Sequence, residues 1–99
     1  MKIINEATGS TLTMRIIGRL DTMTAPELEA ALRTSLTNVN ELVFDFAELE
    51  YISSAGLRVV LNAQKTMSRT GTFIVRHANS DIMEVFEMTG FTDILTIEN

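Results

Sequence analysis

The sequence contains no cysteine, and this one absence excludes several kinds of chemistry. Without cysteine there is no disulfide, no thiolate metal ligand and no cysteine nucleophile. With one proline and five glycines in 99 residues, no stretch has the composition of a linker. No apolar run approaches the ~20 residues of a membrane span, and residues 1–6 lack the apolar centre of a signal peptide. We therefore expect a cytoplasmic protein without membrane insertion.

Positive charge is also scarce. Eight Lys and Arg face thirteen Asp and Glu, which gives a net charge of -5 and a pI near 4.7. Direct nucleic-acid binding needs a basic surface, so this composition argues against it. The hydrophobic fraction of 45% and the charged fraction of 21% are ordinary for a folded protein. A chain of this length predicts one domain, spanning residues 1–99.

What the chain does contain is short strands that alternate with amphipathic helices. Expected strands cover residues 2–6, 11–17, 41–46, 72–76 and 93–97. Expected helices cover residues 24–37, 54–69 and 79–89. The order β-β-α-β-α-β-α plus a short final strand predicts an α/β fold with a mixed central sheet.

Several local signals support these boundaries. The segment Thr24-Ala25-Pro26-Glu27 fits a capping box with proline in the first turn. Leu42-Val43-Phe44 is apolar on both faces, as in a central strand. Gly71 is expected to end the second helix in a left-handed conformation, and Gly90 the third, with Phe91 making the hydrophobic contact that accompanies such a cap. Asn79 or Ser80 caps the third helix. The six methionines are mostly expected to fill the core.

The second long helix has two distinct faces. Leu57, Val60 and Leu61 are predicted to point into the core. Three basic side chains fall on roughly the opposite side: Arg58, Lys65 and Arg69. This stripe is either an ordinary solvated helix face or a docking surface for an acidic partner.

The segment with the most chemical information is Ser53-Ser54-Ala55-Gly56, between a buried strand and this helix. Backbone N–H groups at a helix start are unpaired and carry partial positive charge. A phosphate on a serine would be stabilised there. The alternative interpretation is that one serine caps the helix and Gly56 allows close packing.

The motifs resemble a known family. Asp45-Phe46 followed by Tyr51-Ile52-Ser53-Ser54-Ala55-Gly56-Leu57 is similar to the signature of the STAS domain, the fold of bacterial anti-sigma factor antagonists. Gly18-Arg19-Leu20-Asp21 and Thr24-Ala25-Pro26-Glu27-Leu28 resemble that family's second-strand exit and first helix. Met88-Thr89-Gly90-Phe91 resembles its last helix and tail.

This resemblance implies a partner-switching protein. In the family, the unphosphorylated domain binds an anti-sigma factor that is also a serine kinase, and this frees the sigma factor. Phosphorylation of a serine at the start of the second helix abolishes binding, and a serine phosphatase restores it. The matching residue here is Ser54. Many members carry Asp where this chain has Ser53, so Ser53 is a second candidate. The resemblance also implies partner contacts at Asp21, Ser53, Ser54, Gly56, Arg58 and Lys65.

Other interpretations stay open. The same fold serves as the cytosolic STAS subunit of a lipid-transport ABC assembly, which binds its ATPase constitutively. A small enzyme using Asp21, Asp45 and Ser54 would need these side chains to cluster. His77 is the sole histidine and the chain has no cofactor motif, so we expect neither catalysis, nor a metal, nor a cofactor.

Overall fold

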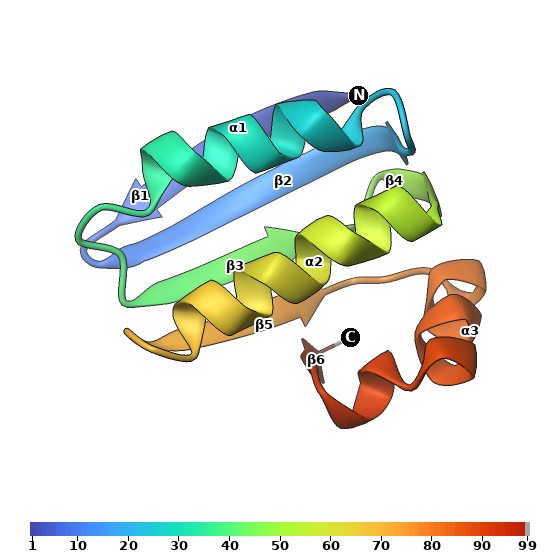
Figure 1. Cartoon of the computed structure of the whole chain (residues 1–99). Coiled ribbons are helices and arrows are strands. Elements are labelled where there is room, and N and C mark those ends of the chain that lie inside the picture. The colour runs from blue at the N-terminus through green and yellow to red at the C-terminus, as the bar shows by residue number, and fades with distance from the viewer. Residues whose placement is uncertain (99) are drawn as a thin grey trace.

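In the computed structural model, which describes residues 1–98, two long helices lie across one face of a twisted sheet (Figure 1). The strands are β1 (Lys2–Thr8), β2 (Thr11–Leu20), β3 (Glu41–Asp45), β4 (Leu49–Ile52), β5 (Thr72–Arg76) and β6 (Thr96–Glu98). The helices are α1 (Ala25–Ser35), α2 (Ser54–Met67), α3 (Ser80–Thr89) and a 3-10 turn, η1 (Phe91–Asp93). The α/β class and the order of the predicted elements are confirmed.

The sheet is mixed, as expected. Its strand order is β1-β2-β3-β5-β6, and β1 pairs with β2 in an antiparallel hairpin while the other neighbours run parallel. Gly9 closes the hairpin with a φ of 61°, which glycine adopts without steric cost. The alternation in β2 also holds, because Leu12, Met14 and Ile16 are all buried in the core under the helices. The connections from β2 to β3 and from β3 to β5 contain α1 and α2, the two helices that cover one face of the sheet (Figure 1).

One strand was not predicted. β4 runs parallel to the last part of β2, with Leu20 opposite Ile52, on the side of β2 away from β1. It has four residues, of which Leu49 and Ile52 are buried and the two between them are exposed. This pattern does not alternate, so the strand rule does not detect it.

The central strand β3 is buried on both faces, as predicted. Leu42 and Phe44 are 0% exposed and Val43 is 1% exposed. Leu42 and Phe44 join the core beneath the helices, where Phe44 packs edge-on against Phe73 with ring centroids 4.8 Å apart.

The inward face of α2 differs in part from its prediction. Leu57 and Val60 are buried as expected, but Leu61 is only half-buried and the prediction for it was wrong. Val59 is 3% exposed and takes its place in the core, followed one turn apart by Ala63 and Met67. The helix packs against α1 as well as against the sheet, so its buried arc is wider than a single sheet contact would make it.

Two predicted helix ends were wrong. The Thr24 side chain does not cap α1; its hydroxyl donates to the carbonyl of Arg19 at 2.8 Å instead. Gly71 does not have a left-handed φ. Glycine is required at position 71 because a Cβ there would collide with the carbonyl of Asn40. The N–H of Gly71 donates to the carbonyl of Met67 at 2.7 Å, and this bond ends the turn after α2.

The end of α3 agrees with its prediction. Asn79 caps the start, accepting from the N–H of Ile82 at 2.8 Å. Gly90 has a φ of 80°, and the ring of Phe91 stacks on Phe86 at 6.2 Å. The final strand begins at Thr96, later than predicted, because η1 occupies the preceding residues.

Candidate functional site

The start of α2 is fixed to the end of β2 by backbone contacts. The N–H of Ser53 donates to the carbonyl of Leu20 at 2.9 Å. Gly56 packs so closely here that a Cβ would lie 2.7 Å from Leu20 Cγ and 2.9 Å from Ile52 Cγ1. The expectation that Gly56 allows close packing therefore has a physical basis. This packing gives the first turn of α2 a defined position.

The two serines at this helix start differ in their surroundings. Ser53 is the N-cap: it is half-buried, has extended backbone angles, and its Oγ accepts from the N–H of Gly56 at 3.3 Å. Ser54 is the first helical residue and is exposed. Within residues 1–98 its hydroxyl makes no hydrogen bond to another protein group. A modifying enzyme can therefore reach the Ser54 hydroxyl without breaking an existing contact.

The charge at this end of α2 favours an anion. The first turn of α2 has no acidic side chain, whereas α1 has Glu27 and α3 has Asp81 in the same position. The N-terminal end of a helix carries a partial positive charge, which an anion stabilises. A phosphoryl group on Ser54 would supply the negative charge that α2 lacks.

Asp21 follows the last residue of β2, at the same end of the sheet as Ser54, but its side chain bonds within its own turn. Its carboxylate accepts from the N–H groups of Met23 and Thr24 at 3.0 and 3.1 Å. The N–H of Thr24, helped by that of Met23 and by the guanidinium of Arg19, lowers the pKa of Asp21 against the opposing effect of burial. This geometry gives Asp21 a turn-forming role.

Asp45 lies elsewhere. It is opposite Arg15 in the sheet, and the end of β2 is five residues further along. At ~3.3 Å per residue this separates Asp45 from the Ser54 end by roughly 15–20 Å. The cluster of Asp21, Asp45 and Ser54 that a small enzyme would need is therefore not assembled.

Asp45 instead accepts from the N–H of Ala47 and from Nδ1 of His77, both at 3.0 Å. Burial opposes its ionisation, but these hydrogen bonds and the charge of His77 outweigh that effect and lower its pKa. His77 itself adopts a φ of 61°, uncommon for a residue with a side chain. The pair joins the segment after β5 to the end of β3.

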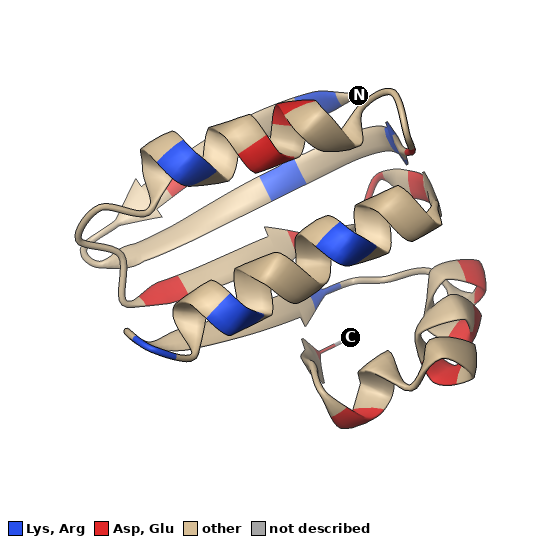
Figure 2. Ribbon diagram, in the orientation of Figure 1, with Lys and Arg blue, Asp and Glu red and all other residues tan. Residues whose placement is uncertain are grey.

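The basic stripe lies on the surface, as predicted, but α2 ends at Met67, before the predicted end at residue 69, so Arg69 lies in the turn that follows the helix. Arg58, Lys65 and Arg69 are all exposed, and Figure 2 shows the basic bands of α2 on its outward side. Among residues 1–98 these three side chains form no ion pair, unlike Arg33, which is bonded to Glu29 at 2.6 Å. Arg58 is one turn from Ser54 and therefore on the same face of the helix.

Sequence reasoning missed three exposed side chains, of which Met23 and Tyr51 lie near this end of the sheet. Most of the methionines contact the core, as expected, but Met23, in the turn after β2, is 83% exposed and Met88 is 79% exposed. Tyr51 is 41% exposed, and the guanidinium of Arg19 lies 4.2 Å from its ring centre. A contiguous exposed apolar patch marks a contact surface, whereas a single exposed apolar side chain is ordinary.

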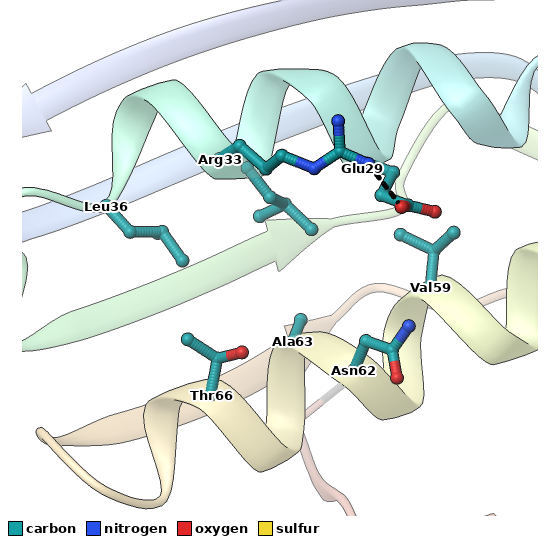
Figure 3. Close-up of a pocket in the computed structure, with 8 residues that line it drawn as sticks. Glu29, Arg33, Leu36, Val59, Asn62, Ala63 and Thr66 are labelled. Atoms are coloured by element: carbon teal, nitrogen blue, oxygen red, sulfur yellow. Dashed lines mark hydrogen bonds and ion pairs between the residues drawn. The ribbon is translucent and has the colours of Figure 1, made fainter.

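A separate groove lies between α1 and α2 (Figure 3). It encloses about 330 Å³ over an apolar floor. Its lining consists of Glu29, Leu32, Arg33, Leu36, Val59, Asn62, Ala63 and Thr66. Neither serine contributes to it, so it is not part of the site at the start of α2.

The described residues contain no group of three or more His, Asp or Glu side chains placed to hold a metal ion. None of the helices formed by residues 1–98 is long and apolar enough to span a bilayer.

Comparisons with known proteins agree with this arrangement. Residues 2–99 match the STAS domain family model. BtrV of Bordetella bronchiseptica, which carries the name of an anti-sigma factor antagonist, is 33% identical over all of this chain and 87% of its own length. The anti-sigma-B factor antagonist of Listeria monocytogenes is 34% identical over 85% of this chain and 75% of its own length.

The solved structure of the phosphorylated form of the Bacillus cell fate determinant SpoIIAA superposes with a TM-score of 0.77. The match covers 99% of this chain and 92% of that one, at 20% identity. At this identity the likeness supports the fold.

Proposed function

The chain belongs to the STAS domain family, and we propose that it is an anti-sigma factor antagonist whose binding is switched off by phosphorylation of Ser54. The unphosphorylated form binds an anti-sigma factor that is also a serine kinase, which frees the sigma factor. A serine phosphatase returns the protein to the binding form. The names of the relatives from Bordetella and Listeria support the antagonist role.

One observation carries the choice of residue. Ser53 and Ser54 are adjacent, but the Ser53 oxygen is already bonded to the N–H of Gly56. Ser54 is exposed on the same helix start. A kinase that approaches this end of α2 meets the Ser54 hydroxyl first, and the transfer leaves the helix cap intact.

Phosphorylation is expected to act on the partner surface rather than on the fold. It adds about -1.5 to -2 charges, which the N-terminal end of α2 tolerates. On the outside, the hydrated group obstructs close contact with the kinase. Burying an unpaired charge or placing like charges together costs several kcal/mol, and each ~1.4 kcal/mol weakens binding tenfold. We therefore expect at least a hundredfold loss of affinity without a rearrangement.

The switch is tested by incubating the protein with its kinase and ATP and locating the phosphate by mass spectrometry. The Ser54→Ala variant should bind the kinase and should not be released when ATP is added. The Ser54→Asp variant should remain folded but bind the kinase weakly. Ser53→Ala is the matched control and should still be phosphorylated. Phosphate on Ser53, with a Ser54→Ala variant that still switches, would contradict the assignment. Binding that is unaffected by ATP would favour the alternative, in which the protein is a STAS subunit of a transporter and binds its ATPase constitutively.

A further inference from the structure

We propose that the free edge of β1 is a self-association surface, on which the β1 strand of a second copy of this chain pairs antiparallel about a two-fold axis at Ile4. This inference does not depend on the proposed function. It rests on the position of β1 in the sheet, on its regularity and on the order of its charged side chains.

The outer edge of β1 is open. β1 is the first strand of the sheet order and pairs with β2 along one side only. In the described part of the chain, no backbone hydrogen bond links the other side of Lys2–Thr8 to another segment. A row of unpaired N–H and C=O groups is a template for a further strand.

β1 also lacks two of the features that usually prevent such pairing, a bulge and a proline. Its register with β2 runs without interruption from Lys2 to Thr8, so no bulge bends the edge away. It contains no proline. The opposite edge of the sheet is β6, which has three residues and offers far less backbone. Of these two edges, β1 is therefore the one that offers enough backbone for a further strand to pair with.

The side chains select one register. In an antiparallel pair, opposite residues point to the same face, so the two-fold axis must pass through a residue. An axis at Ile4 places Ile4 opposite its copy and Lys2 opposite Glu6 twice. An axis at Asn5 places Ile4 against Glu6, which sets an apolar side chain against a charge. Opposite charges across strands are favourable, so the Ile4 axis is preferred.

Lys2 and Glu6 are exposed and Ile4 is half-buried. Lys2, Ile4 and Glu6 share a face with Thr13, Arg15 and Ile17 through the β1–β2 register. That face is opposite the core under the helices, because the alternate residues of β2 are the buried ones. The side chain of Glu6 is 58% exposed and its contact with Arg15 is long, at 3.8 Å. A lysine from a second copy can approach it.

The two-fold pairing leaves the start of α2 open. β4, which leads into Ser54, pairs with β2 on the side away from β1. A dimer through β1 therefore presents two separate Ser54 sites. One strand from each copy buries little area, at or below the low end of specific interfaces near 1,200 Å². We accordingly expect a weak dimer that forms as the concentration rises.

Charge reversal gives a sharp test. Lys2→Glu places two acidic pairs across the axis, and Glu6→Lys places two basic pairs there. Each variant alone should remain monomeric in sedimentation velocity up to concentrations at which the wild type dimerises. An equimolar mixture of the two should dimerise, because every Lys2→Glu strand then faces a Glu6→Lys strand with both pairs complementary. Circular dichroism checks that both variants are folded.

Glu87→Lys, an exposed change of the same size on α3, is the control and should associate like the wild type. A wild-type protein that is monomeric at every concentration tested, up to the solubility limit, would overturn the proposal. So would a mixture that behaves as the average of the two separate variants.

Discussion

The N–H of Ser53 and the carbonyl of Leu20 form a 2.9 Å hydrogen bond that joins the start of α2 to the end of β2. Together with the close packing of Gly56, this bond holds the candidate phosphorylation site in place before any partner arrives. Ser53 thus stabilises the helix start through both its backbone N–H and its side-chain oxygen. The side chain of Ser54 is exposed and does not contribute to the core.

We predict that the two serines differ in their effect on stability. Ser53→Ala removes the N-cap oxygen and should lower the free energy of unfolding by about 1 kcal/mol. Ser54→Ala should change it by less than about 0.5 kcal/mol, because an exposed side chain without partners is removed. Urea denaturation of the two variants and the wild type measures this difference. Equal losses would mean that the capping role is assigned to the wrong residue.

Gly56→Ala should be strongly destabilising. Its Cβ would lie 2.9 Å from the carbonyl oxygen of Leu20, which is backbone and cannot turn away. Overpacking of this kind costs about 1–3 kcal/mol. Gly90→Ala is a useful comparison because nothing lies within 4 Å of the added Cβ. There the cost is that of the left-handed backbone alone, roughly 1–2 kcal/mol. Thermal unfolding that leaves Gly56→Ala at the wild-type midpoint would contradict the packing.

Met67→Ala should cost more than Leu61→Ala. Met67 is 1% exposed and removing its side chain leaves a cavity, for which about 2–5 kcal/mol is typical. Leu61 is half-buried, and its truncation should fall below that range. Chemical denaturation of both variants tests the corrected helix face, and the reverse order would restore the face expected from the sequence.

Acid unfolding should depend on Asp45. Its pKa is lowered in the folded state from an ordinary value of 3.8. The stability that its ionised form contributes is therefore fully present above that ordinary value, and it is lost as the pH falls through the lower folded value. Asp45→Asn should lose less stability than the wild type between about pH 5 and pH 3. Denaturant midpoints across this range provide the measurement, with Asp93→Asn, on η1, as the control. Parallel curves for wild type and Asp45→Asn would rule out the linkage.

The basic stripe predicts an effect on association rather than on folding. Reversing Arg58 and Lys65 together should slow binding to an acidic partner by about tenfold at low salt and weaken the salt dependence of the rate. Stability should hardly change, because exposed charges contribute little to it. Stopped-flow association across a salt series tests this, with Arg76→Glu, on the sheet, as the comparison. Rates that are the same for all three proteins would make the stripe an ordinary solvated surface.

The parts of the fold that were predictable have regular patterns. β2 alternates, β3 is a short apolar run and α3 has a clear cap at each end. β4 has no period to detect, because only its first and last residues face the core. The Thr24 capping box failed because the carbonyl of Asp21 already accepts from Thr24 and Ala25, so the chain turns before the helix begins.

The site was predictable where it depends on local sequence. Ser54 stands at the helix start, as the motif indicated. The distance between Asp45 and Ser54 depends instead on β4, which carries the chain along the sheet after β3. Because β4 was not expected, the separation between Asp45 and Ser54 could not be predicted from the sequence. The exposure of Met23 likewise depends on how far the turn after β2 projects, which no residue pattern encodes.

The parallel pairing of the central strands has a consequence for how the chain folds. The β1–β2 hairpin needs only Gly9 and Ser10 to close, so it can form early. β2 must wait for Glu41 to arrive opposite Thr11, and β3 must wait for Thr72 to arrive opposite Glu41. Distant pairings require long loops to close first, which slows folding. During synthesis from the N-terminus, Ser54 therefore emerges well before the strand that completes the sheet beneath its helix. The finished surface exists only on chains whose last third has been made.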